Sequence, residues 1–558
     1  MKIKRIAALG ATLLMVATAA GSLTACGGGA GTIGGGTTGG GSDSTKANLY
    51  VGTYDGGVGK AWLEEAAARF MELHKDSTHF QEGRTGVKVH VDGDKVKYSG
   101  TQLSTGALTK DVYFTEAVEY YTFVNSGKVA DITDVITNPA GYGETATIES
   151  KLDDSFKSYM TAGTDGKYYM VPFYDGLYGI MYDIDLFEEV GFYYDQDGDF
   201  LRLLPNGDRA TFEANKSNGP DGVKGTYDDG LPATYAEFIA LADYMKTKNV
   251  VPFCYSGAYN DYVSKVFRSF IADYEGYDAF NLNYTFNGTA TLVKSVNADG
   301  SIETEEVVIT EDNAYELQKQ AGKYYALKMQ EELFGSVEYI GNKYNTFDFT
   351  VAQLEFVKSK YTKTRYAMLL DGVWWENEAD GVFKDLEALR GEKKSDRHFG
   401  FLPIPKVDES SLGGQTLLSA NSSFGFVNAK STNMELAKEF MRFLHTDAEM
   451  AKFTAKTSIP RSFNYTIGED IKETATSFGQ SVIDLKNNSQ IVYPYSALPI
   501  IVNNMASFTE TKWFMTSSVG GATLENPFTA FEKGSANALQ YFNGLYTYQK
   551  NAWKLLKR

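Results

Sequence analysis

Residues and motifs that would identify an enzyme are scarce in this chain. Only five of its 558 residues are histidines, and none occurs in the H-E-x-x-H spacing of zinc-dependent hydrolases. There is no G-x-S-x-G motif for a nucleophilic serine and no Cys-His pair in a recognisable setting. The segment before Lys60 resembles a phosphate-binding loop but lacks its first glycine and its hydroxyl residue. We therefore assign no catalytic residue, although the many carboxylates leave a two-carboxylate glycosidase open.

The chain also has fewer basic than acidic residues. Lys and Arg together number 53 against 71 Asp and Glu, so the formal net charge is −18. Binding to nucleic acid needs clustered Lys and Arg that neutralise phosphates, so we expect no nucleic-acid partner. Beyond the N-terminal segment, no apolar run is long enough to span a bilayer.

Cysteine occurs only twice, and the first one lies in a segment with the features of a secretory signal. Basic residues precede an apolar run over residues 6–20, which ends in small residues. The following sequence Leu-Thr-Ala-Cys, ending at Cys26, resembles a bacterial lipobox, in which the signal is cut before the cysteine and the thiol is acylated. We therefore expect residues 1–25 to be a lipoprotein signal peptide and Cys26 to carry the lipid, a palmitate-type acyl anchor.

A glycine-rich segment follows Cys26. Glycines offer no side chains to bury and lose the most backbone entropy on ordering, so residues 26–45 are predicted to form a flexible tether. The mature protein would then sit at the extracytoplasmic face of the cell membrane, anchored by lipid. The second cysteine, Cys254, then has no intramolecular partner, and its apolar surroundings favour a packed core thiol.

About 510 residues remain after the tether, which is enough for two or more domains with full cores. A buried strand at 48–54 precedes a helix around 60–75, where apolar residues recur at helical spacing. A second strand follows at 86–93, and the alternation of strands and helices continues. This order predicts an α/β fold.

Two insertions interrupt the alternation. Residues 193–230 are acidic and rich in glycine, and loops of this length are uncommon unless they are functional or held in place. Residues 281–310 alternate polar and apolar side chains around an Asp-Gly pair, which predicts a β-hairpin.

The acidic loop also raises a metal hypothesis. Alternating aspartates converge oxygen atoms on one cation in calcium-binding loops, although Phe200 and Asn206 replace the glycine and the glutamate of an EF-hand. A structural calcium site and a solvated acidic loop are about equally favoured, and we expect no other cofactor. The candidate calcium ligands are Asp195, Asp197, Asp199, Asp221, Asp228 and Asp229.

Aromatic residues make up 14% of the chain, and a pair of tryptophans stands out among them. The sequence DGVWWENE, over 371–378, places the pair beside carboxylates directly after an apolar strand. Sugar rings stack on indole faces while carboxylates and amides bind their hydroxyl groups. By itself the pair does not decide the role, because two tryptophans after a strand belong to the core more often than to a ligand platform.

Several segments, in order, resemble the bacterial extracellular solute-binding proteins of family 1, the maltose-binding-like receptors of ABC importers. The resemblance implies two α/β lobes of the type II periplasmic-binding-protein kind, joined by hinge crossings and closing over a carbohydrate, with an oligosaccharide as the expected ligand. The segments are 110–132, 168–192, 231–246, 365–379, 398–405 and 433–453.

By this resemblance, lobe 1 comprises residues 46–172 plus 404–460, and lobe 2 comprises 173–403 plus 461–558 with both insertions. It implies a monomeric receptor that delivers its ligand to the membrane permease subunits of an ABC transporter. The expected ligand-binding residues are Tyr54, Asp55, Thr115, Glu116, Tyr174, Asp175, Tyr259, Tyr262 and Trp374, with Trp513 as a looser match.

The chain departs from the family at some of these positions. Thr115 stands where the maltose binder has an aromatic residue, and Asp-Gly-Val-Trp over 371–374 replaces Asn-Gly-Pro-Trp. These departures leave the identity of the sugar open. They also keep alternatives in view: a surface-anchored carbohydrate-active enzyme or adhesin, or a receptor for a non-sugar solute.

Overall fold

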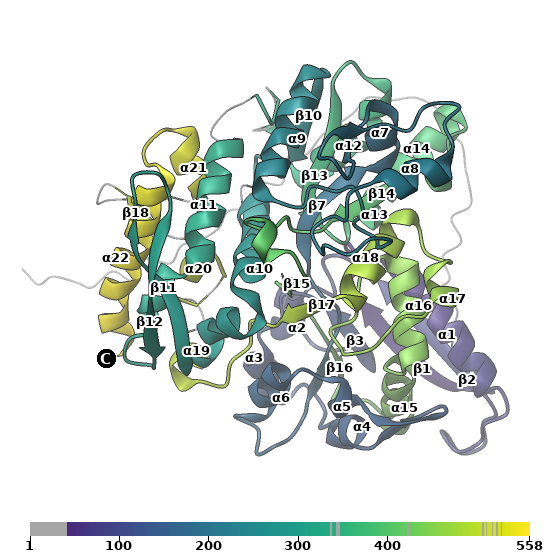
Figure 1. Cartoon of the computed structure of the whole chain (residues 1–558). Coiled ribbons are helices and arrows are strands. Elements are labelled where there is room, and N and C mark those ends of the chain that lie inside the picture. Colours follow the sequence, from purple (N-terminus) through teal and green to yellow (C-terminus); the bar gives the residue numbers. More distant parts are fainter. Residues whose placement is uncertain are drawn as a thin grey trace, which may run out of the picture. The chain divides into compact units, whose positions relative to one another are not determined.

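Two β-sheets, each assembled from segments far apart in the sequence, organise the chain (Figure 1). The predicted signal peptide, Cys26 and tether residues 26–41 lie outside the described residues. Within the described part, no helix has the length and apolarity needed to cross a membrane. The computed structural model describes residues 42–259, 261–334, 338–341, 346–420, 423–504, 507–508, 510–515, 517–519, 523–525 and 527–557.

The first sheet has the strand order β2-β1-β3-β16-β6, and the elements around it form lobe 1. β1 runs parallel to β2 and β3, whereas β16 pairs antiparallel with β3 and β6. β1 and β3 are almost fully buried, as their near-continuous apolar sequences predict for strands inside an α/β sheet. The strands are Ala47–Thr53 (β1), Val87–Gly93 (β2), Val112–Thr115 (β3), Met170–Pro172 (β6) and Phe424–Val427 (β16).

Short helices and one small hairpin, β4–β5, surround this sheet. The elements are α1 (Ala61–Leu73), α2 (Gly100–Thr105), α3 (Tyr120–Asn125), α4 (Thr133–Thr137), β4 (Pro139–Gly141), β5 (Glu144–Thr147), α5 (Ile148–Lys151), α6 (Asp154–Thr161), α15 (Met434–Leu444) and α16 (Asp447–Thr457).

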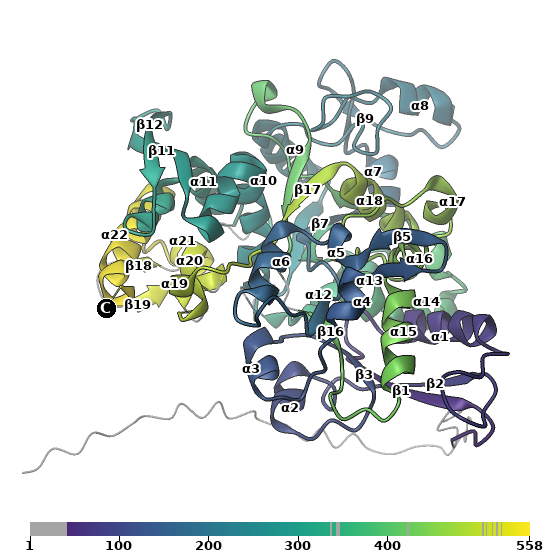
Figure 2. The same cartoon turned by 90° about the horizontal axis from the view of Figure 1, so that it is seen from below.

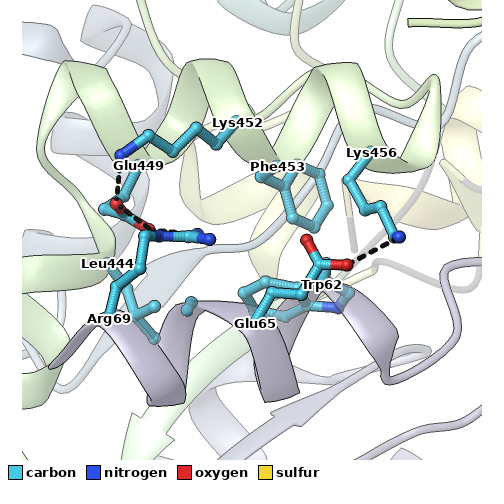
Figure 3. A pocket seen from close by; sticks show the side chains of 9 residues that line it. Trp62, Glu65, Arg69, Leu444, Glu449, Lys452, Phe453 and Lys456 are labelled. Atoms are coloured by element: carbon cyan, nitrogen blue, oxygen red, sulfur yellow. Dashed lines mark hydrogen bonds and ion pairs between the residues drawn. The ribbon is translucent and has the colours of Figure 1, made fainter. Parts of the chain in front are cut away.

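Figure 3 shows how α16, from the C-terminal half of the chain, packs against α1. Trp62 packs edge-on against Phe453, with ring centroids 4.8 Å apart. The Arg69 guanidinium donates to both carboxylate oxygens of Glu449, at 2.6–3.1 Å. An apolar contact and a bidentate ion pair thus join two helices that are remote in sequence.

The second sheet has the order β10-β13-β7-β14 and organises lobe 2. β10 and β13 are parallel, and β7 pairs antiparallel with β13 and β14. Its elements are β7 (Tyr178–Asp183), β10 (Val250–Tyr255), β13 (Arg365–Gly372), β14 (Phe399–Leu402), α7 (Ile184–Val190), α9 (Tyr235–Thr247), α10 (Asp261–Thr285), α12 (Phe349–Lys358), α13 (Trp375–Glu378), α14 (Asp380–Arg390), α17 (Glu469–Lys472) and α18 (Ser477–Asn487).

Crossing segments between the two sheets form the hinge. Residues 173–177 connect β6 to β7, and residues 403–423 lead from β14 back to β16. The second crossing contains β15 (Gln415–Leu418), which pairs in parallel with β17 (Ser489–Val492). The expected two-lobed α/β fold with hinge crossings is confirmed.

The two insertions differ from their predicted forms in detail. The acidic segment is not devoid of secondary structure, because Asp208 caps a helix, α8 (Arg209–Asn215), that follows the short strands β8 (Tyr193–Tyr194) and β9 (Phe200–Leu201). The predicted hairpin is confirmed as β11 (Gly288–Val296) and β12 (Ile302–Ile309). Its first predicted residues instead end α10, since the helix continues to Thr285.

The hairpin packs with C-terminal helices at one side of lobe 2 (Figure 2). Their core combines Val293 of the hairpin with Tyr324, Phe542 and Leu545. The elements are η1 (Ala314–Lys319), α11 (Ala321–Phe334), α19 (Pro499–Val502), α20 (Glu510–Met515), β18 (Ser517–Val519), β19 (Thr523–Glu525), α21 (Pro527–Glu532) and α22 (Ala538–Leu556). A short 3-10 helix, η3 (Ser359–Tyr361), instead connects α12 to β13 in lobe 2.

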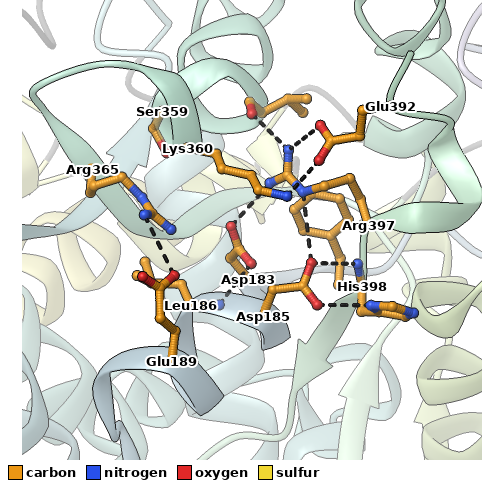
Figure 4. Close-up of polar contacts among 12 residues, drawn as sticks. Asp183, Asp185, Leu186, Glu189, Ser359, Lys360, Arg365, Glu392, Arg397 and His398 are labelled. Carbon is orange, nitrogen blue, oxygen red and sulfur yellow. Dashed lines mark hydrogen bonds and ion pairs between the residues drawn. The ribbon is translucent and has the colours of Figure 1, made fainter. Parts of the chain in front are cut away.

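A buried arginine just before β14 connects several segments of lobe 2 through hydrogen bonds and ion pairs (Figure 4). The Arg397 guanidinium donates to Asp183 at 3.1 Å and to the carbonyl oxygen of Val357 at 3.1 Å. Glu392 lies 3.7 Å from the same guanidinium. Burial raises the pKa of Asp183, and the nearby Arg397 charge opposes that rise.

Replacing Arg397 with Met should lower the free energy of unfolding by about 3–5 kcal/mol, because Asp183 would stay buried without its cation. Urea denaturation followed by circular dichroism measures the change. The matched control is Arg209→Met, whose exposed ion pair with Glu188 should be worth about 1 kcal/mol or less. Equal losses in the two variants would contradict a structural role for the buried cluster.

Candidate functional site

Aromatic and acidic side chains from both lobes lie together beyond the ends of β1, β3 and β13. Tyr54 and Glu116 follow β1 and β3, so they share one edge of the first sheet. Burial raises the pKa of Tyr54, and the charges of Glu116 and of Glu378, which ends α13 in lobe 2, add to the rise. We define the interlobe cluster as Tyr54, Glu116, Tyr174, Tyr178, Tyr262, Trp374 and Glu378.

The carboxyl group of Glu116 is held in a constrained position. Burial raises its pKa to about 7 and the Glu378 charge adds to the rise, against a hydrogen bond with Tyr174. Ala117 has a φ of 53°, a left-handed conformation that costs a non-glycine residue about 1–2 kcal/mol. Gly100 permits this turn, since a Cβ there would lie 2.4 Å from the Glu116 carbonyl oxygen. Such strain is typical of ligand-binding turns.

Trp374 is the point where the lobes touch within the cluster. Its ring meets Tyr178 edge to face, with centroids 4.9 Å apart and planes at 88°. A Cβ added to Gly57, in the turn after β1, would lie 2.6 Å from the Cβ of Trp374. Trp374 is only 8% exposed in this arrangement, because lobe 2 supports its ring and the lobe 1 turn covers it.

Tyr262 extends the aromatic surface along α10. Its ring is nearly parallel to that of Phe349, at 6.2 Å and 7°, and meets Tyr178 edge to face at 5.8 Å. The Lys265 ammonium lies 4.9 Å from the centre of the Tyr178 ring and 3.1 Å from its hydroxyl oxygen. Aromatic faces, a cation and carboxylates therefore occur side by side.

Two carboxylates in lobe 2 share one amide donor. The Gln353 amide nitrogen donates to Asp371 at 3.0 Å and to Glu378 at 2.8 Å. Burial raises the pKa of both acids, and the Glu378 charge raises that of Asp371 further. Asp371 is buried, whereas Glu378 is partly exposed and accessible to a ligand. Chemically, the cluster offers ring faces for stacking and carboxylates for accepting hydrogen bonds.

A family model described as bacterial extracellular solute-binding protein matches residues 77–476. The chain belongs to this family. The match covers most of both sheets and every residue of the interlobe cluster except Tyr54. No curated protein sequence matches the chain.

Solved structures of solute-binding proteins are similar to this chain. The cyclic α-maltosyl-1,6-maltose binding protein of Arthrobacter globiformis is 13% identical, with a TM-score of 0.50 over 90% of this chain and 97% of that chain. A probable secreted solute-binding lipoprotein of Streptomyces coelicolor is also 13% identical, with a TM-score of 0.49 over 90% and 99%. The GacH receptor of Streptomyces glaucescens is 14% identical, with a TM-score of 0.48 over 91% and 99%.

Three other expected ligand residues of this solute-binding protein lie at the margin of the cluster or below it. Thr115 is fully buried, and its hydroxyl group donates to the carbonyl oxygen of Tyr98 at 2.6 Å, so it supports the turn. Tyr259 is 54% exposed beside Phe349. Asp55 lines a groove between α1 and α14, next to the cluster.

The structure places Trp513 away from the interlobe cluster, so its expected role as a ligand residue gains no support. It is 1% exposed, and its indole N–H donates to Asn283 at 2.9 Å. Its ring packs with Phe286 and Trp553 in the core of the C-terminal helices. Its place in the sequence, in a helical segment after the hinge, could not distinguish a core residue from a ligand platform.

Asp175 also has a different place from the one expected, because it is fully buried in the first crossing. Its backbone N–H donates to the carbonyl oxygen of Pro460, and Tyr493 donates to its carboxylate at 3.5 Å. Burial raises the pKa of Asp175 to about 7, with Lys486 acting in the opposite direction. Asp175 therefore belongs to the hinge interior, and its neighbour Tyr174 faces Glu116.

Aspartates of the acidic loop accept hydrogen bonds from backbone N–H groups of the same loop. Asp195 accepts from the N–H groups of Asp197 and Asp199 at 2.9 Å, and Asp228 accepts from the N–H of Asp221 at 2.9 Å. Asp229 accepts from backbone N–H groups as well. Across the described residues, no group of three or more acidic, His or Cys side chains is arranged to hold a metal. The calcium hypothesis gains no support from this geometry and stays a prediction.

Sequence reasoning missed four residues of the site or its support. Tyr178 and Glu378 lie inside segments that carry the family resemblance, yet nothing in their spacing indicated their orientation. Lys265 and Gln353 occupy ordinary helical positions on α10 and α12. Only the packing of those helices on the second sheet brings them to the cluster.

Substituting Asp175 with Asn should change how stability depends on pH. The folded-state pKa of about 7 lies above the usual value near 4, so the folded protein binds a proton that the unfolded chain releases between these pH values. The contribution of Asp175 to stability therefore falls as pH rises through this window.

We expect the stability difference, Asp175→Asn minus the unsubstituted protein, to increase from about pH 4 to about pH 7. Urea denaturation at a series of pH values measures it. Asp385→Asn, at an exposed position, is the control and should show a constant difference. A difference for Asp175→Asn that stays constant, or falls, would refute the buried-acid interpretation.

Proposed function

We propose that this solute-binding protein is a receptor that captures a carbohydrate, most simply an oligosaccharide, between its two lobes. The observation that carries the proposal is the interlobe cluster, in which Trp374 and tyrosine rings stand beside Glu116 and Glu378. Sugar rings combine apolar faces with hydroxyl rims, so they suit flat aromatic surfaces edged by hydrogen-bond acceptors. The similar Arthrobacter protein is named for a cyclic saccharide, which agrees with this ligand class.

Closure of the lobes follows from where the cluster residues come from. Glu116 belongs to lobe 1 and Trp374 to lobe 2, and Tyr174 lies in the crossing between them. A ligand that contacts all three binds the closed arrangement better than the open one. It therefore shifts the equilibrium toward closure by that difference in affinity.

Replacing Trp374 with Ala should reduce oligosaccharide affinity by about thirtyfold or more, since a buried aromatic anchor commonly contributes over ~2 kcal/mol. Isothermal titration against a glycan panel measures the loss. The matched control is Trp375→Phe, because Trp375 is fully buried against Phe399 and away from the cluster. That variant should lower thermal stability but keep ligand affinity. Unchanged affinity in Trp374→Ala would remove the central residue from the proposal.

A carbohydrate-active enzyme using the same cluster is the alternative. Glu116 and Glu378 are two nearby carboxyl groups with raised pKa. Glycosidases use a carboxylic acid of raised pKa as their general acid. Saturable one-to-one binding with no product from labelled oligosaccharides supports the receptor. Release of product would favour the enzyme.

The receptor is further proposed to be a monomer that hands its ligand to the permease subunits of an ABC transporter from a lipid-anchored position. Membership of the solute-binding family supports the transport role, and the lipobox-like sequence before Cys26 supports the anchor. The glycine-rich segment after Cys26 would let the lobes reach both ligand and permease.

Substituting Cys26 with Ser should release the protein from the membrane, because serine has no thiol to acylate. Cell fractionation and immunoblotting measure the shift, and metabolic labelling with palmitate tests the modification directly. Cys254→Ser is the control and should remain membrane-bound. Retention of the Cys26→Ser protein on membranes, with label still incorporated, would overturn the anchor.

A further inference from the structure

A pocket of about 640 Å³ lies at the hinge and includes no residue of the interlobe cluster. Its volume falls within the range of about 300–1,000 Å³ that is usual for small-molecule sites. The loop 463–466, the end of α18 and strand β17 supply most of its lining. These segments follow α16, where the chain passes from lobe 1 to lobe 2.

The pocket has walls on both lobes. Asp153, which caps α6 of lobe 1, accepts a hydrogen bond from the Tyr277 hydroxyl of α10 at 3.0 Å. Tyr277 directly follows Gly276, where α10 is interrupted by a φ of 75°. Both residues line the pocket, so one hydrogen bond crosses between the lobes at its edge.

The charged groups of the lining are already engaged within the protein. Asp153 also accepts from the backbone N–H of Ser155 at 2.8 Å. The buried Lys486 ammonium donates to the carbonyl oxygens of Phe463 and Tyr465, and it lies 4.1 Å from the centre of the Tyr465 ring. No strong ionic partner is left for a charged ligand among the residues that line the pocket.

The remaining lining suits an uncharged, hydroxylated molecule. The half-buried ring of Tyr277 presents a flat apolar surface, and Asn464, Thr466 and Gln490 are exposed and carry amide or hydroxyl groups. Aromatic faces with amides at the rim are the same chemistry that favours sugars at the interlobe cluster.

We propose that this hinge pocket is a second binding site for a small neutral saccharide, and that its occupancy biases the lobes toward one arrangement. The floor of the pocket supports this coupling, because the Tyr493 hydroxyl donates to Asp175 of the first crossing. The Asp153–Tyr277 hydrogen bond can persist only while α6 and α10 keep their present spacing. A ligand bridging these walls therefore binds one lobe arrangement better than another.

The test uses the purified protein carrying Trp374→Ala, which removes the first site, with glucose, maltose, sucrose and trehalose as probes. Ligand-observed NMR titration measures binding. Gln490→Trp, added to Trp374→Ala, fills the hinge pocket and should weaken the residual binding by about tenfold or more. The matched control adds Asn488→Trp instead, at an exposed position outside the lining, and should leave residual binding unchanged.

A second readout tests the coupling. Spin labels at exposed Glu82 and Glu387, each replaced by Cys, report the distance between the lobes by pulsed electron paramagnetic resonance. The bound probe should shift this distance in Trp374→Ala, and Gln490→Trp should abolish the shift. The proposal would be overturned by any of three results: Trp374→Ala binds none of the four probes, residual binding survives Gln490→Trp, or the distance between the spin labels does not change. Each of these results would leave the first site intact. If Trp374→Ala binds like the unsubstituted protein and Gln490→Trp alone abolishes binding, the proposed first site fails and the hinge site stands.

Discussion

Backbone pairing between two crossing segments is the constraint on which the rest of the structure depends. The N–H of Phe173 donates to the carbonyl oxygen of Ser423 at 3.0 Å, and that of Ala420 donates to the carbonyl oxygen of Gly176 at 2.9 Å. These bonds place the ends of β6 and β7 beside the segment that returns to β16. Each sheet thereby gains strands from both halves of the chain, and the loops after β1, β3 and β13 come together.

The hinge is also where the protein concentrates buried polar groups. Asp175, Tyr493, Lys486 and Arg461 all lie there, and burial moves the pKa of each away from its usual value. Buried polar groups are costly unless they are paired, so such a network favours a few discrete arrangements over a continuum. A hinge of this kind can join two lobes firmly and still let a ligand select between arrangements.

Periodicity and turn residues predicted much of the fold, because the strands and helices of the two lobes are locally consistent with their sequences. The hairpin over 288–309 and the buried strand ending at Thr53 are examples. The acidic segment was harder, since Asp208 starts a helix whose short apolar pattern is weak. Part of the candidate site was also predictable, because Tyr54, Glu116 and Trp374 directly follow strands.

The sequence by itself determined the family and the α/β alternation, since both depend on local order along the chain. Only the tertiary structure decided which aromatic and acidic side chains share a surface. It placed Trp374 in the interlobe cluster and Trp513 in the core of the C-terminal helices. It also turned Tyr174 toward Glu116 and buried its neighbour Asp175 in the hinge. The physical reason is that burial and side-chain direction are set by contacts between segments hundreds of residues apart, such as Phe173 with Ser423.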